Sequence, residues 1–192
     1  YAFLPAAVVA GCVKAVESFP GLHLALQLKD ELHAFNCPLA DFAYPLWGID
    51  PQLSIPLNPN VFNQTVKILI YFENLVDSVT DLPSSLVNLC QTICMDQANV
   101  YLTDQGKVLQ ITNNQTNKFK SIDHLRRQLN LKPEEIVVFG DDWNDLEMLT
   151  GFPNGVVMGN ADRELRCQIL YQTQSNDKDG IAYALHTLLG LI

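Results

Sequence analysis

The stretch of the sequence that is richest in chemically active side chains runs from Ile136 to Met148, IVVFGDDWNDLEM. Its apolar start predicts a buried strand, and its later apolar residues recur at helical spacing. The turn between them carries Asp141, Asp142 and Asp145, at the end of the strand where open α/β sheets bind ligands. Three crowded carboxylates repel one another unless a cation offsets them, and hard oxygen ligands favour Mg²⁺. One interpretation of this turn is therefore a magnesium site.

The same residues also suit an ordinary helix cap. Asp142 is a good N-cap residue, and Asp145 would favour the positive end of the helix dipole in the first turn. Spacing alone leaves capping and metal binding both open.

Longer motifs around this turn resemble a known family. GDDWNDLEML is similar to the fourth motif, GDxxND, of the haloacid dehalogenase (HAD) superfamily of phosphohydrolases. VVMGNA at 156–161 and SNDKDGIAYAL at 175–185 resemble the Cof-type subfamily. NKFKSIDHLRRQLNLKPEE, upstream, resembles the lysine motif of that subfamily and the helix after it. The resemblance is specific from about Lys118 to the end of the chain.

The resemblance implies roles for three residues of the acidic turn. Asp141 matches the position that ligates Mg²⁺ directly, and Asn144 matches the residue that contacts the substrate phosphate. Asp145 is implied as a catalytic and metal-site residue, which either binds a metal-bound water or orients Lys118. Asp142 falls at a variable position and is expected only to cap the helix.

Lys118 matches the catalytic, phosphate-binding lysine of the resembling family. Its charge would neutralise the phosphoryl group in transfer and the attacking carboxylate. Two features leave open whether Lys118 or Lys120 matches the lysine of the family motif. Phe119 stands where the family usually has glycine, and Lys120 lies only two residues further on. Asn160, in the MGNA segment, follows a strand end in a loop that the resembling family uses near its site, but left-handed turn chemistry is the favoured interpretation.

The nucleophile of the resembling family has no counterpart among these 192 residues. That family uses the first aspartate of a DxDxT motif, and no DxD pair followed by threonine occurs here. The family places this motif before its cap, so the chain is expected to be a fragment. The fragment alone is expected to be inactive. It is also expected either to self-associate through an uncovered strand edge, to aggregate, or to retain a separately supplied N-terminal piece.

The element pattern divides the chain into two parts. Residues 1–113 predict an α+β domain with an antiparallel sheet, which resembles the family's cap. Residues 114–192 alternate strands and helices, which predicts the C-terminal half of a Rossmann-like parallel sheet core. The proline-rich segment from Asp50 to Asn60 is expected to be an irregular loop. Expected helices cover 6–19, 41–47, 84–94, 119–129, 143–149, 162–167 and 179–189, and expected strands cover 23–28, 31–35, 65–72, 99–103, 107–112, 136–139, 155–158 and 170–173.

Composition narrows the classes of partner. A net charge of -9 and a pI of about 4.7 argue against a basic surface for nucleic acid or anionic membranes. Five scattered cysteines, an odd number, do not suggest a disulfide framework, and a cytoplasmic location fits them. Cys90 and Cys94 share a helical face and are expected in the core.

The resemblance implies an α/β phosphatase that uses Mg²⁺ to hydrolyse a small phosphorylated metabolite, such as a sugar phosphate, through an aspartyl-phosphate. Two alternatives stay open: a non-catalytic binding module that keeps the fold, and a related phosphomutase. The cap contacts that would choose the substrate are not identified by sequence.

Overall fold

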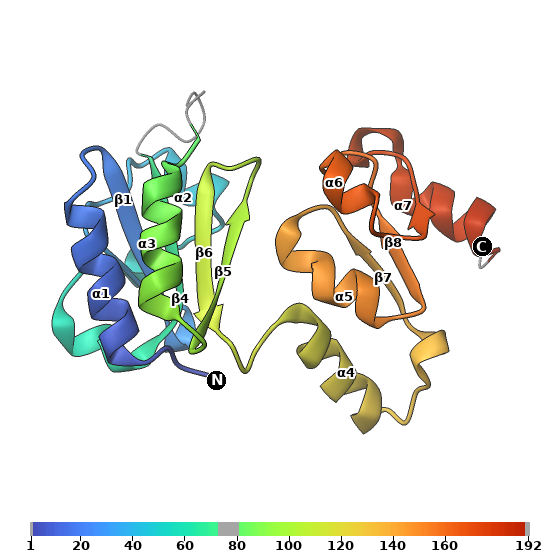
Figure 1. Ribbon diagram of the computed structural model, residues 1–192, viewed down its shortest axis with the longest axis horizontal. Coiled ribbons are helices and arrows are strands. Elements are labelled where there is room, and N and C mark those ends of the chain that lie inside the picture. The colour runs from blue at the N-terminus through green and yellow to red at the C-terminus, as the bar shows by residue number, and fades with distance from the viewer. Residues whose placement is uncertain (1, 73–80, 191–192) are drawn as a thin grey trace. The chain divides into compact units, whose positions relative to one another are not determined.

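The computed structural model describes residues 2–72 and 81–190. The chain forms two compact units, Tyr1–Gln115 (unit 1) and Thr116–Ile192 (unit 2). The division falls within the polar NNQTN segment, two residues beyond the predicted boundary. Each unit has its own sheet and its own buried cluster (Figure 1).

Unit 1 is built on a six-stranded sheet in the order β3-β2-β1-β4-β6-β5. Neighbouring strands are antiparallel except for the parallel pair β2 and β3. The predicted hairpins are present, and the one before β2 turns through Asp30 and Glu31 with positive φ. The strands are β1 Leu22–Leu28, β2 His33–Phe35, β3 Ser54–Pro56, β4 Thr65–Phe72, β5 Ala98–Thr103 and β6 Val108–Asn113.

Two helices, α1 Ala6–Glu17 and α3 Ser84–Cys94, cover one face of this sheet (Figure 1). Alternate residues of the strands point towards them, such as Ile68 and Ile70 of β4, which are fully buried. Cys90 and Cys94 also lie in this core, as predicted, together with Cys12 of α1.

The opposite face of the sheet is only partly covered. The segment that holds the short helix α2, Ala43–Leu46, packs Tyr44, Trp47 and Ile49 over Tyr71 and its neighbours. The prediction of an irregular loop from Asp50 to Asn60 is wrong, because this segment contains β3, one complete 3-10 turn and the start of another. A strand that includes Pro56 is possible here because β3 lies at the edge of the sheet, where a missing N–H costs no ladder bond.

Unit 2 contains a parallel sheet in the order β7-β8-β9, so the predicted α/β class is confirmed. Its strands are β7 Val137–Gly140, β8 Asn154–Val157 and β9 Tyr171–Gln172, and its helices are α4 Lys118–Gln128, α5 Leu146–Gly151, α6 Arg163–Arg166 and α7 Gly180–Tyr183. A π-helical turn, Ala184–Leu188, continues α7. In the described part of the chain, β7 pairs with β8 alone, and self-association through its other edge stays a prediction. No helix within the described ranges has the length and apolar character that a membrane span needs.

Candidate active site

The acidic turn follows the end of β7 and is tighter than predicted. Trp143–Asp145 forms one 3-10 turn, and α5 begins only at Leu146. The predicted capping role of Asp142 is confirmed, since its Oδ1 accepts a hydrogen bond of 2.7 Å from the Trp143 backbone N–H.

Asp145 is a buried carboxylate held by the backbone of its own turn. It is 4% exposed, and its Oδ2 accepts hydrogen bonds from the backbone N–H groups of Asp141, at 3.2 Å, and Asp142, at 3.3 Å. Gly140 makes this approach possible, because a Cβ at that position would lie 2.5 Å from Asp145 Cβ. The sequence GDDWND thus folds its last carboxylate back over the end of the strand.

Lys118 reaches the other oxygen of this carboxylate. Asn117 caps α4 by accepting a hydrogen bond of 2.8 Å from the Lys120 N–H, which fixes Lys118 as the first residue of the helix. Lys118 Nζ lies 2.5 Å from Asp145 Oδ1 and donates to Asn144 Oδ1 at 3.3 Å. Its side chain remains 50% exposed, so the oriented ammonium still faces solvent.

The structure explains why a large side chain, Phe119, can follow Lys118 where the family usually has glycine. Its ring packs against Phe152, with centroids 5.2 Å apart, beside Gly151 of α5. A Cβ on Gly151 would lie 2.4 Å from the Phe119 ring, so the bulk of Phe119 is matched by the missing side chain of Gly151. The residue after the lysine thus anchors α4 to α5 without entering the acidic turn.

Asn160 contacts the acidic turn, although sequence reasoning favoured turn chemistry for it over a place near the site. The expected left-handed turn is absent from the described chain at this position, since the φ of Asn160 is not positive. Its Nδ2 donates to Asp141 Oδ2 at 2.7 Å, and its Oδ1 accepts from the Asn176 N–H at 3.2 Å. Asn160 therefore joins three motifs that lie far apart in sequence, and only their shared position at one sheet edge would have revealed the link.

The two predicted metal residues differ in how well they suit a cation. Asp141 is exposed, and within the described residues only its Oδ2 accepts a hydrogen bond. Both oxygens of Asp145 are engaged by Lys118 and backbone N–H groups. The described residues contain no group of three or more His, Cys, Asp or Glu side chains able to hold a metal ion. Mg²⁺ often takes only one or two carboxylates, with water and phosphate completing its shell, so Asp141 fits such a partial site.

Comparison with known proteins shows the family to which this chain belongs. A family model described as haloacid dehalogenase-like hydrolase matches residues 56–185, which include the acidic turn and Lys118. The chain belongs to this family. The sequence resemblance to HAD hydrolases of the Cof type is thereby confirmed.

This HAD chain matches two relatives over most of its own length but over different shares of theirs. The Bacillus subtilis (strain 168) protein YxeH, which carries a phosphatase name, is 29% identical over 174 residues, or 86% of this chain and 63% of YxeH. The chloroplastic endoribonuclease YBEY of Arabidopsis thaliana is 34% identical over 157 residues, or 81% of this chain and 26% of that protein.

A solved HAD structure shows the same fold. The subclass IIB sugar phosphatase BT4131 superimposes with a TM-score of 0.79 at 18% identity, over 100% of this chain and 69% of that one. This likeness concerns the fold alone. The chain spans somewhat less than two thirds of YxeH, so the activity of the whole protein is a matter of proposal.

Proposed function

We propose that this chain supplies one half of the active site of a Mg²⁺-dependent phosphatase. The substrate would be a small phosphorylated metabolite such as a sugar phosphate, and Lys118, Asn144, Asp145 and Asp141 would carry the chemistry on this side. The observation that carries the proposal is the contact of 2.5 Å between Lys118 Nζ and the buried Asp145, which aims a half-exposed ammonium.

Lys118 would stabilise the negative charge that a phosphoryl group and its attacking carboxylate bring together. A preorganised cation does this without reorganisation at the moment of reaction. Asp145 would orient Lys118 rather than hold a metal, because both of its oxygens already accept hydrogen bonds. Asn144 shares the ammonium of Lys118 and would contact the phosphate without adding charge.

Asp141 would be the metal ligand on this side of the site, with Asn160 holding its orientation through Oδ2. Bound Mg²⁺ would supply positive charge to the phosphate oxygens. Asn160 would act as a positioning residue, since it would act through Asp141, to which its side chain donates.

The nucleophilic carboxylate would come from outside these residues, since they contain no DxD pair followed by threonine, the motif that carries it in the family. The phosphoryl group would pass to that aspartate as the alcohol leaves with a proton, and water would then release inorganic phosphate. The activity is therefore proposed for the polypeptide that joins this chain to such an aspartate.

A magnesium titration of that polypeptide tests the metal assignment. We expect Asp141→Asn to raise the Mg²⁺ concentration needed for half-maximal turnover and to lower turnover at saturation by orders of magnitude, since a charged ligand is lost. Asp142→Asn is the matched control, because the Asp142 carboxylate caps the turn. This variant should leave the magnesium dependence unchanged. An Asp141→Asn enzyme with the wild-type magnesium curve would remove Asp141 from the site.

A further inference from the structure

Trp143 makes a long-range contact that the acidic turn alone does not explain. It is the first residue of the 3-10 turn, and its ring packs against the buried cluster of unit 2 while remaining partly exposed. Its indole Nε1–H donates to Asp162 Oδ2 at 3.2 Å, across 19 residues of sequence. Because the apolar part of the ring is packed and its N–H has an acceptor, the orientation of the indole is restrained on both sides.

Asp162 accepts from this indole instead of capping its own helix. It stands at the N-cap of α6, where an aspartate usually accepts from the first N–H groups of the helix. In the described chain its side chain makes no such cap hydrogen bond, and its exposed carboxylate accepts from Trp143. The carboxylate thus ties the start of α6 to the acidic turn.

Two side-chain bridges of matching spacing connect the acidic turn to residues 158–162, which follow β8 and are called the β8 loop below. Asn160 donates to Asp141, and two residues further along both segments Trp143 donates to Asp162. Each segment supplies one donor and one carboxylate. The two segments therefore hold each other through a pair of hydrogen bonds that run in opposite directions.

The backbone fastens the β8 loop at its start. The Met158 N–H donates to Gly140 O at 2.9 Å, which extends the pairing of β7 with β8. Asn160 holds Asp141 only while the loop lies against the acidic turn, and the bridge from Trp143 closes the loop beyond Asn160. The second bridge therefore supports the first.

We propose that Trp143 and Asp162 are positioning residues for the metal ligand of the proposed active site. Their hydrogen bond keeps the β8 loop against the acidic turn, so that Asn160 holds Asp141 through Oδ2 and leaves its other oxygen for Mg²⁺. Trp143 acts through Asn160 and touches neither the metal nor the substrate. The inference rests on the proposed function, because it needs Asp141 to bind magnesium.

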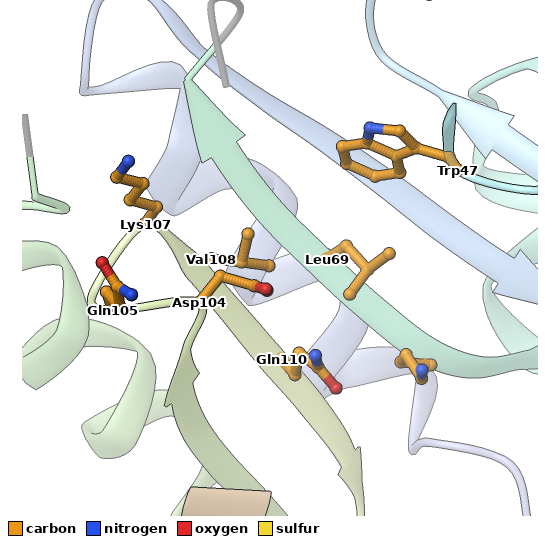
Figure 2. Close-up of a pocket in the computed structure, with 8 residues that line it drawn as sticks. Trp47, Leu69, Asp104, Gln105, Lys107, Val108 and Gln110 are labelled. Atoms are coloured by element: carbon orange, nitrogen blue, oxygen red, sulfur yellow. The ribbon is translucent and has the colours of Figure 1, made fainter. Parts of the chain in front are cut away.

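The hydrogen bond itself is tested by NMR on the 192-residue chain, without metal or substrate. The chain has two tryptophans, and the other one, Trp47, lies in unit 1 in the same cluster as Leu69 (Figure 2). The indole N–H signal that Trp143→Phe removes therefore belongs to Trp143. We expect Asp162→Ala to speed the solvent exchange of this proton about threefold or more, since the proton loses its acceptor. Asp162→Asn keeps an acceptor oxygen and should keep most of the protection. Unchanged exchange in folded Asp162→Ala would overturn the proposal.

The effect on the metal is tested in the polypeptide that also supplies the aspartate nucleophile. Calorimetry measures Mg²⁺ binding without substrate, and thermal unfolding shows that each variant is folded. We expect Trp143→Phe, which keeps an aromatic ring in the cluster, and Asp162→Ala each to weaken Mg²⁺ binding at least about fivefold. Wild-type Mg²⁺ affinity in folded Trp143→Phe would overturn the proposal.

Asp162→Asn separates the hydrogen bond from the charge. This variant retains an acceptor for the indole, so it should weaken Mg²⁺ binding by less than about twofold at physiological salt, where exposed charges are screened. If Asp162→Asn lost as much affinity as Asp162→Ala, the charge of Asp162 would be responsible and the proposal would fail.

A double variant shows whether Trp143 acts through Asn160. In Asn160→Ala the loop no longer holds Asp141, so adding Trp143→Phe should cause little further loss of Mg²⁺ affinity. Losses that multiply would show that Trp143 acts by another route and would contradict the proposal. Failure of the proposed function itself has a different signature, since the wild-type polypeptide would then bind no Mg²⁺ although the indole N–H of the 192-residue chain is protected as expected.

Discussion

At the scale of single residues, the candidate site depends on a carboxylate that accepts hydrogen bonds from three donors. Asp145 accepts from Lys118 and from two backbone N–H groups of its own turn. Because Asp145 is buried, losing one donor leaves part of a charge uncompensated away from water. The position of Lys118 is thus tied to the packing of the turn against Gly140.

Gly140→Ala is expected to displace Asp145 and its lysine. The added Cβ would lie 2.5 Å from Asp145 Cβ, so the turn must shift, and a shift of this kind costs about 100-fold in turnover. Val137→Ala, at the start of β7, is the control for lost strand packing, and it should reduce thermal stability with little change in turnover. Equal turnover of the two variants would show that Gly140 has no part in positioning the site.

Residue-level reasoning from sequence succeeded where neighbours in the motif interact. Asp142 was recognised as a cap because its partner is the next residue. The link from Asn160 to Asp141 spans 19 residues, and no local pattern encodes it. Turn preference, the local signal at Gly159 and Asn160, pointed to a left-handed turn that the chain does not adopt.

At the scale of elements, α4 carries the lysine and must be held against α5. Phe119 contacts Phe152 and fills the space beside Gly151, within the buried cluster of unit 2. This packing fixes the start of α4, where Lys118 lies.

Gly151→Ala is expected to destabilise unit 2 by about 1–3 kcal/mol, since the new methyl group overlaps the Phe119 ring. Phe119→Ala should also be destabilising on its own, because it removes a partly buried ring from the cluster. In the double variant the overlap is gone. The loss of unfolding free energy measured with denaturant should therefore be smaller than the sum of the losses in the two single variants. Thr150→Ala, at the neighbouring exposed position, is the control. Strict additivity would contradict the proposed contact.

Sequence patterns predicted the long elements and most of the short ones, but they missed the short strand β3. The helix of α1 and the strand of β4 have enough apolar repeats to specify their type. Strand β3 was missed because Pro51, Pro56 and Pro59 signal irregular backbone, and only the edge of the sheet allows a strand there. The first turn of the expected helix at Trp143 is 3-10 because Asp145 is drawn back to the N–H groups of Asp141 and Asp142.

At the scale of the whole molecule, each unit has a buried cluster built only from its own residues. Residues 1–115 are therefore expected to fold alone, with a cooperative thermal transition and the circular dichroism of a mixed α/β protein. A polypeptide of these residues that lacks a cooperative transition would show that the six-stranded sheet needs unit 2 for its stability.

The most direct test of the proposed chemistry compares Lys118→Ala with Lys120→Ala in the polypeptide that also supplies the aspartate nucleophile. The measurement is the turnover number for p-nitrophenyl phosphate at saturating Mg²⁺, with thermal unfolding to show that both variants are folded. We expect Lys118→Ala to lose at least about 100-fold and Lys120→Ala to change little, because Asp145 and Asn144 hold the ammonium of Lys118 in place. The reverse ranking, or full activity without Lys118, would contradict the assignment.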